Sequence, residues 1–273
     1  AKVLKKMLPR KIGINYAAIS LKSLRDFRSL LKGKKFLDVS QALGKIRETK
    51  TNEELRKLEK SCKIAAKIIE SVPNMAKVGM QERELEKKIE EMIELHDVEF
   101  SFPPIVASGA NSSVPHHVTS SKKIRRGEVL LVDIGAAFEN YCSDITRTFY
   151  VGRADDEVKN AYDVVKRSQE AALHAIKQGA KTVDVFEVSE KILRTGLKQP
   201  LIHSLGHGIG VEVHDFPEGL SPKSKYILKE NMALAIEPAY YGKKYGIRME
   251  DDVVVTRSGC KLLTKSPKDL VEI

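Results

Sequence analysis

The chain has 273 residues, of which 42% are hydrophobic, and a formal net charge of +10 from 47 basic and 37 acidic side chains. This length and composition suit one large globular domain with part of a second. We expect no membrane span, because no run approaches roughly 18 apolar residues. The N-terminal AKVLKKMLPRK also lacks the apolar segment of a secretory signal.

The cysteine content bears on the cellular location of the chain, and its charge bears on the binding partners that it could have. Cys62, Cys142 and Cys260 have unrelated spacings and form no CxxC pair, so we expect reduced thiols and a cytoplasmic location. The basic charge would suit nucleic acid or another acidic partner, but Lys and Arg are spread along helical stretches already rich in Glu. We therefore expect a solvated charged surface and no nucleic-acid partner.

Residues 1–48 mix short apolar pieces, such as IGINYAAIS, with basic helical stretches, and they are too few for a complete α/β domain. A break follows at RETKTNEE. Thr51 and Glu54 have the spacing of a capping box, and apolar residues then recur at helical intervals over 55–72. The sequence predicts a domain boundary near this break, with the second domain over 49–273.

Residues 49–273 look like two similar halves. Segments 63–93 and 168–193 each give a helix end, a turn with Gly and a second helix, and strand-like runs follow each of them. These runs are 128–151, which predicts a hairpin, and then VEVHDF, NMALAIEP and GIRMEDDVVVT. Hairpins without βαβ alternation favour an antiparallel sheet with helices packed against one face. The predicted fold class is α+β.

Four carboxylates and one histidine lie in apolar strand-like runs, the histidine in GHGIG, with no basic partner expected to neutralise them. Burial of such groups is too costly unless they are paired or bind a metal. Because side chains alternate along a strand, Asp133 and Asp144 can point into one pocket. We interpret the set as a site for two divalent metal ions, and its members are Asp133, Asp144, His207, Glu237 and Glu250.

The composition of this set indicates its chemistry. Oxygen ligands with one imidazole suit Mn, Co, Fe or Zn in a two-metal site. Two metals about 3.5–4 Å apart lower the pKa of a bridging water and polarise a carbonyl oxygen. Those effects are the requirements of amide hydrolysis.

Several histidines lie near the predicted ligands. His203 and His207 are four residues apart, as in the HExxH zinc helix, but the glycines of GHGIG argue against a helix and no Glu follows His203. The glycines instead suit close backbone approach beside a site, with His214 as a neighbouring donor. The turn-rich SGANSSVPHHVTS predicts a loop from which His116 or His117 reaches the site.

Together, SGANSSVPHH, LLVDIGAAFENYCSDITRTF, HSLGHGIGVEVHD, ALAIEPAY and GIRMEDDVVVT resemble the signature blocks of the pita-bread metallopeptidases. This is the family of Xaa-Pro aminopeptidases, prolidases and methionine aminopeptidases. The resemblance covers about residues 50–273 and keeps the family's order. It implies a curved antiparallel sheet with helices on its outer face and an internal pseudo-twofold duplication.

By position, the resemblance implies that Asp133 binds one metal ion and that His207 and Glu237 bind the other. Asp144 and Glu250 would bridge the two ions. A hydroxide between the ions would attack the substrate carbonyl, and Glu237 would shuttle the proton. Mn or Co is the expected metal, with Zn and Fe as alternatives.

Three further residues would act on the substrate. His116 matches the first histidine of the family's loop motif, which steadies the substrate and the tetrahedral intermediate. His214 matches the histidine that hydrogen-bonds the scissile carbonyl or flanking amide, whereas His117 and His203 have no secure match. Arg248 lies two residues before the last metal ligand, on the same face of the strand, and resembles the arginine beside the active site of Xaa-Pro enzymes.

Arg248 favours the Xaa-Pro branch, because methionine aminopeptidases usually have Glu followed by His in this strand. Residues 1–48 resemble the tail of a creatinase-like N-terminal domain and its linker. The resemblance therefore implies a dimetal exopeptidase, prolidase or Xaa-Pro aminopeptidase, which acts on small peptides with proline at the second position. It leaves the oligomeric state open, with a homodimer as one option. A methionine aminopeptidase is the enzymatic alternative, and a non-catalytic pita-bread module that binds protein or RNA is the alternative of another class.

The chain departs from the family pattern in two places. Ala239 follows Pro238, where EPG is usual, and this change suggests altered backbone freedom beside the metal ligand. Residues 1–48 would also supply only the tail of the creatinase-like N-terminal domain, as expected for either a short member of the family or a fragment. In the Xaa-Pro enzymes that domain helps to form the dimer and to close the substrate pocket.

Overall fold

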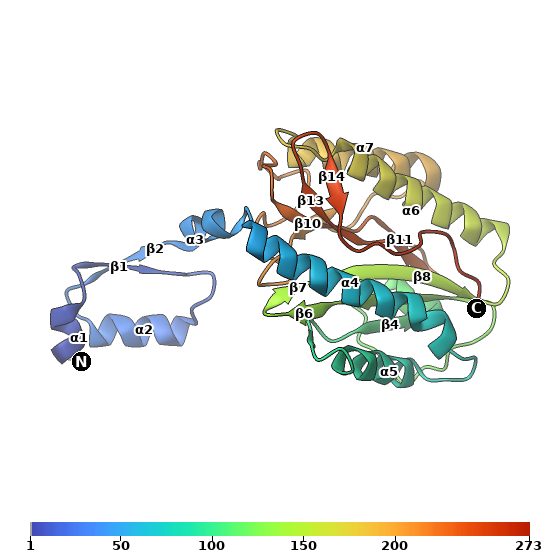
Figure 1. The fold of residues 1–273 in the computed structure, drawn as a ribbon, viewed down its shortest axis with the longest axis horizontal. Coiled ribbons are helices and arrows are strands. Elements are labelled where there is room, and N and C mark those ends of the chain that lie inside the picture. Colours follow the sequence, from blue (N-terminus) through green and yellow to red (C-terminus); the bar gives the residue numbers. More distant parts are fainter. Residues whose placement is uncertain (1) are drawn as a thin grey trace. The chain divides into compact units, whose positions relative to one another are not determined.

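The computed structural model describes residues 2–273, and the chain divides into two compact units between Glu48 and Thr49 (Figure 1). The elements of the first unit are α1 (Lys2–Met7), β1 (Lys11–Ile14), α2 (Leu21–Leu30), β2 (Lys35–Asp38) and α3 (Ser40–Arg47). Strands β1 and β2 pair in parallel.

The net charge of the chain belongs to this first unit. Residues 1–48 contain 13 Lys and Arg against 3 Asp and Glu, whereas residues 49–273 contain 34 of each. We expected the basic residues to be spread along Glu-rich helices, but the excess of ten positive charges lies entirely in residues 1–48. Aspartate and glutamate together balance the lysine and arginine in the second unit only.

The second unit contains two helix pairs and a series of short antiparallel sheets. Its helices are α4 (Asn52–Met75), α5 (Glu82–Glu94), α6 (Asp156–Ala175) and α7 (Thr182–Leu197), with a 3-10 helix η1 (Gly109–Ser113). Its strands are β3 (Glu99–Phe100), β4 (Ile105–Ser108), β5 (Glu128–Ile134), β6 (Ala136–Phe138), β7 (Tyr141–Cys142), β8 (Ile145–Val151), β9 (Gly206–Gly208), β10 (Ala233–Ile236), β11 (Ala239–Tyr241), β12 (Gly246–Arg248), β13 (Asp251–Val255) and β14 (Cys260–Leu262).

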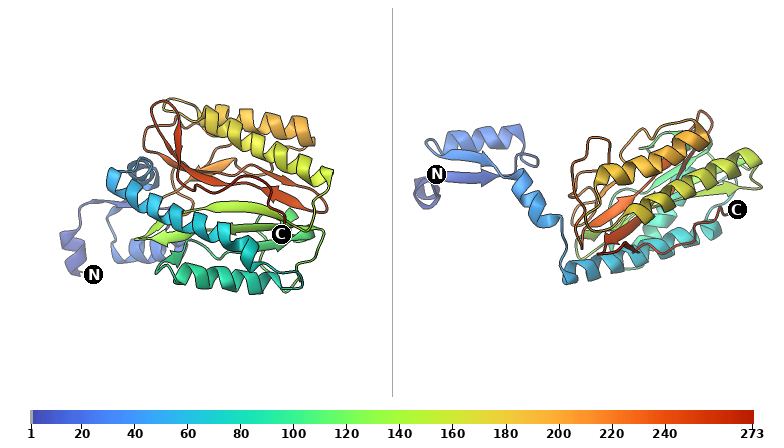
Figure 2. Two further views of the ribbon diagram at one scale, coloured as in Figure 1. Left: turned by 45° about the vertical axis from the view of Figure 1, so that its right-hand side comes forward. Right: turned by 90° about the horizontal axis from the view of Figure 1, so that it is seen from above.

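Each half of the second unit combines one helix pair with one main antiparallel sheet. The first half has α4 and α5 with the order β4-β5-β8, and the second half has α6 and α7 with the order β14-β13-β10-β9. The two helix pairs flank the strands, and α4 crosses in front of them (Figures 1 and 2). Each half has its own apolar cluster between helices and strands. The predicted α+β class and the duplication are confirmed.

Helix α4 forms as its sequence predicts. Thr51 Oγ1 accepts a hydrogen bond from the Glu54 amide at 3.3 Å, and Glu54 Oε2 accepts one from the Thr51 amide at 2.7 Å. This capping box satisfies two donors that would otherwise lack partners at the helix start. The apolar side chains from Leu58 to Val72 recur every three or four residues and are buried beneath the helix.

Two predicted strands need correction. VEVHDF (211–216) is a loop, because it meets β9 only through one bridge, between Asp215 and Gly208. GIRMEDDVVVT is two strands, β12 and β13, with a break at Met249 and Glu250. The Glu250 amide there donates to Thr146 O of β8 at 3.1 Å, so the chain changes its partner at that residue. Within residues 2–273, no helix is both long and apolar enough to cross a membrane.

Candidate metal centre

The five predicted ligands converge on one pocket from both halves of the second unit. In the first half, Asp133 lies on β5 opposite Thr146 of β8, and Asp144 directly precedes β8. In the second half, His207 lies on β9 and pairs with β10, while Glu237 directly follows β10. The fifth predicted ligand, Glu250, occupies the break between β12 and β13.

The pocket has a volume of about 280 Å³. All eight site residues predicted from the sequence line it: the five carboxylate and imidazole ligands, together with His116, His214 and Arg248. Apolar side chains complete the wall, namely Phe102, Ile105 and Val213. Apolar walls around convergent polar groups are typical of small-ligand sites.

The geometry of the acidic groups fits a cation. Asp144, His207 and Glu250 each offer a ligand atom, and these atoms lie within 4.8 Å of one another. Among the described residues, no hydrogen-bond partner meets the buried Oδ1 atoms of Asp133 and Asp144. Buried oxygens without partners are costly, so these two point to a group that is bound from outside the chain.

Burial and mutual repulsion raise the pKa of three of these carboxyl groups. Burial is the largest cause for Asp144, followed by the charges of Glu250 and Asp133. Burial and Glu250 raise the pKa of Glu237, and burial and Asp133 raise the pKa of Glu250 to about 7. Divalent cations at the centre of the group would reverse this repulsion and stabilise the ionised forms.

The tautomer and the neutral state of His207 suit metal binding through Nε2. Its Nδ1 lies 3.0 Å from Gly208 O, and a carbonyl oxygen only accepts, so Nδ1 must hold the ring proton. Burial lowers the pKa of His207 to about 4, so the ring is neutral at pH 7. Nε2 therefore keeps a free lone pair, and this atom lies 3.7 Å from Asp144 Oδ2 and 3.9 Å from Glu237 Oε1. A backbone acceptor that fixes the tautomer in this way is typical of metal-binding histidines.

Glycine in GHGIG permits this placement of His207. A Cβ at Gly206 would collide with the carbonyl oxygen of Ala235 on β10, and a Cβ at Gly208 would collide with the backbone of Phe216. The close backbone approach predicted from the glycines is confirmed. The ring of His214 stacks on that of His207 with centroids 4.0 Å apart.

Arg248 corrects the expectation that the acids have no basic partner. Its Nη2 donates to Asp133 Oδ2 at 2.5 Å, and both side chains are buried. Its Nη1 donates to Tyr241 Oη at 2.9 Å and to Pro115 O at 3.0 Å, while Nε donates to Thr146 Oγ1 at 3.0 Å. Most of its donors are therefore occupied by the protein itself.

The structure also places residues in or behind the pocket that sequence analysis did not assign. His203 lines the pocket, with Nδ1 3.9 Å from Glu237 Oε2 and Nε2 3.1 Å from Tyr241 Oη. Behind the pocket, Asp252 Oδ2 accepts from the Asp144 amide at 2.8 Å. The spacing of four between His203 and His207 was the available signal for His203. His117, in contrast, bonds to Glu82 and is absent from the pocket lining.

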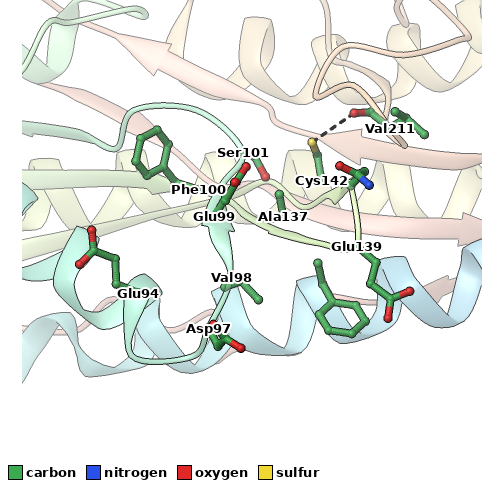
Figure 3. A pocket seen from close by; sticks show the side chains of 12 residues that line it. Glu94, Asp97, Val98, Glu99, Phe100, Ser101, Ala137, Glu139, Cys142 and Val211 are labelled. Atoms are coloured by element: carbon green, nitrogen blue, oxygen red, sulfur yellow. Dashed lines mark hydrogen bonds between the residues drawn. The ribbon is translucent and has the colours of Figure 1, made fainter.

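A second cavity, of about 740 Å³, lies beside β3, β6 and β7 (Figure 3). Its carboxylates, Glu94, Asp97, Glu99 and Glu139, are exposed to solvent. Cys142 lies in its wall and donates through Sγ to Val211 O at 3.6 Å. Because water solvates these acids, nothing there resembles the buried and crowded carboxylates of the smaller pocket.

Comparison with known proteins identifies the family of this chain. Residues 56–257 match the model of metallopeptidase family M24. The chain belongs to this family. The predicted relationship to the pita-bread metallopeptidases, and the pita-bread fold with it, is therefore confirmed.

Other M24 proteins are similar over nearly the whole chain. An Xaa-Pro dipeptidase of Pyrococcus furiosus is 35% identical over 256 residues, which are 93% of this chain and 73% of the relative. An Xaa-Pro dipeptidase structure from Bacillus anthracis has a TM-score of 0.94 at 33% identity, covering 100% of this chain and 77% of that one. An X-Pro aminopeptidase structure from Thermotoga maritima has a TM-score of 0.90 at 33% identity, covering 100% and 78%.

Proposed function

We propose that this M24 protein is a metal-dependent exopeptidase that hydrolyses the Xaa-Pro bond of small peptides. The observation that carries the proposal is the convergence of four carboxylates and four histidines in one pocket. The names of the relatives, Xaa-Pro dipeptidase and X-Pro aminopeptidase, support the substrate class.

Two divalent ions suit the charge of the proposed site. Four carboxylates lie in the pocket and one of them pairs with Arg248, which leaves three negative charges. Two divalent ions would balance these three charges and leave one positive charge for a bound hydroxide. We propose Asp133, Asp144, His207, Glu237 and Glu250 as the ligands, with Mn or Co preferred to Zn or Fe because oxygen ligands predominate. Bound there, the metals would polarise the scissile carbonyl and lower the pKa of the attacking water.

The remaining chemistry belongs to side chains of the pocket. Glu237, whose pKa burial raises, would hold the proton from the attacking water and pass it to the leaving proline nitrogen. His116 and His214 would donate hydrogen bonds to the substrate carbonyl and to the tetrahedral intermediate. Phe102, Ile105 and Val213 would exclude bulk water from the reacting bond.

A peptide panel with controlled metal content tests the function. Xaa-Pro dipeptides, Xaa-Pro-Xaa tripeptides and Met-Ala peptides would be assayed side by side, with Mn, with Co and after chelation. We expect cleavage of the Xaa-Pro bond that chelation abolishes and added metal restores. Preference for Met-Ala would favour the methionine aminopeptidase alternative. Metal binding without cleavage of any peptide would favour the non-catalytic alternative.

Three further features remain predictions. Residues 1–48 would correspond to the tail of a creatinase-like N-terminal domain and its linker, followed by the catalytic domain over 49–273. The assembly would be a homodimer, which light scattering after gel filtration measures directly. The cytoplasmic location rests on three cysteines, and these are free in the described chain.

A further inference from the structure

One buried carboxylate binds both ends of the loop that contains His116, which runs from Ser108 to Ser120. Glu82 is the first residue of α5 and is fully buried. Its Oε1 accepts hydrogen bonds from the amide and the Oγ of Ser108, both at 2.7 Å. Its Oε2 accepts from the amide of Ser120 at 3.2 Å and from the Oγ at 2.6 Å. Ser108 and Ser120 are the two ends of the loop, so one side chain fixes both.

Glu82 also binds the interior of the loop. Asn111 Nδ2 donates to both carboxylate oxygens, at 2.9 and 3.1 Å, and His117 Nε2 lies 3.1 Å from Oε2. A carboxylate only accepts, so the His117 ring must be protonated at Nε2. Burial pulls the pKa of Glu82 upward, but the hydrogen bonds from Ser120, Ser108 and His117 lower it overall. Glu82 is therefore an ionised anchor for four residues of the loop.

His116 lies between two fixed neighbours. On one side, Pro115 O accepts from Arg248 Nη1 at 3.0 Å. On the other side, the ring of His117 is bound to Glu82. The start of the loop is held as well, because Ser112 Oγ accepts from the Gly246 amide of β12 at 2.8 Å. These contacts leave the backbone at His116 little freedom, and His116 itself lines the pocket.

We infer that Glu82 and His117 are positioning residues that hold His116 at the reacting bond. The inference rests on the proposed function, in which His116 contacts the substrate. It gives a role to His117, which the sequence left unassigned, and to a carboxylate that lies outside the pocket lining. A small displacement of a catalytic group costs rate because the reacting atoms lose their alignment.

A double-mutant cycle tests the inference through the rate. His117→Leu removes the donor, and we expect it to lower kcat about tenfold to a hundredfold with a smaller change in KM. His117→Gln restores an N–H donor and should recover most of that loss. Once His116→Ala has removed the catalytic group, His117→Leu should have no further effect. Equal losses in both backgrounds would overturn the inference.

The control for the cycle is His96→Leu. His96 is exposed just beyond the other end of α5, where its Nδ1 pairs with Met92 O. We expect this variant to keep the wild-type kcat. A loss equal to that of His117→Leu would mean that the effect is not specific to the loop, and it would also contradict the inference.

Hydrogen exchange tests the same idea without catalysis. Glu82→Gln keeps the shape of the side chain but turns an amide donor toward the donors of the loop. In metal-free protein we expect faster amide exchange over 109–120 in this variant, with exchange over 156–197 unchanged. Unchanged exchange over 109–120 would overturn the inference whatever the enzyme cleaves. A wild-type chain that fails to cleave Xaa-Pro peptides would instead refute the proposed function.

Discussion

At the scale of single residues, Asp144 links metal binding to stability. Its charge is buried beside Glu250 and Asp133, and this burial raises its pKa. We expect Asp144→Asn to lower activity at least about a hundredfold, because bound metal supplies several kcal/mol of transition-state stabilisation. Metal content should fall, while the metal-free variant should be at least as stable as metal-free wild type, since one repelling charge is removed.

Elemental analysis and thermal unfolding, each with and without chelator, would measure both effects. Glu94→Gln is the control, because Glu94 is an exposed carboxylate outside the pocket. Wild-type hydrolysis by Asp144→Asn, or by fully chelated protein, would contradict the proposed mechanism.

Arg248 should matter more for the metal-free state than for metal binding. Its guanidinium pairs with Asp133 and also holds Tyr241 and the Pro115 carbonyl. Loss of one partner from a buried ion pair costs about 3–5 kcal/mol. We expect Arg248→Met to destabilise the chelated protein by roughly that amount, and added Mn to recover much of the loss. Calorimetry would measure metal affinity, and a markedly weaker affinity would show that Arg248 helps to build the metal site.

At the scale of elements, Gly206 in β9 sets how closely this strand approaches β10. A Cβ at Gly206 would meet the carbonyl oxygen of Ala235, which cannot move without shifting the strand. We expect Gly206→Ala to cost at least about 1–3 kcal/mol by overpacking and to weaken metal binding by displacing His207. Thermal unfolding and metal titration would measure the two effects.

Gly259, in the turn between β13 and β14, offers a matched control. A Cβ at this position has open space around it. Gly259→Ala should therefore change stability by no more than about 0.5 kcal/mol. If both variants behave alike, close packing of β9 against β10 is not what places His207.

The sequence was sufficient for the parts of this fold that depend on local pattern. The capping box and the apolar spacing specified α4, and alternation along the strands specified the face of Asp133. The predicted ligands could be found from the sequence because Asp and Glu are seldom buried in apolar strands unless a partner or a metal ion compensates their charge. A sheet register then brings these strands together, as the pairing of Asp133 with Thr146 illustrates.

Contacts between distant segments were beyond such reasoning. Arg248 and Asp133 are 115 residues apart, and their pairing depends on how β12 meets β5. His117 likewise finds Glu82, 35 residues earlier, because α5 begins beside the loop. VEVHDF has the alternation of a strand, but its Asp215 amide donates to Gly208 O of β9 and its Glu212 carbonyl accepts from the nearby Gly210 amide. In each case the contact is set by tertiary packing, which local sequence patterns do not encode.

At the scale of the whole molecule, the two units differ in how much they bury. Of the apolar side chains described in residues 1–48, only Leu24 and Leu31 are buried. The exposed large apolar side chains of that unit include Val3, Met7, Leu21, Phe27, Leu30, Leu37, Leu43 and Ile46. The second unit, in contrast, has extended apolar clusters in both halves. A unit of this size with so small a core is marginally stable by itself.

Limited proteolysis should therefore distinguish the units. Residues 1–48 contain 13 Lys and Arg, and segments with few buried contacts open at low free-energy cost. We expect trypsin to cleave within this unit first and to leave a resistant fragment that begins near Lys50, as identified by mass spectrometry. Metal should slow cleavage of the fragment without protecting the first unit, because the proposed ligands all lie in residues 49–273. Resistance of the first unit at high protein concentration, lost on dilution, would mean that a second copy covers its apolar side chains.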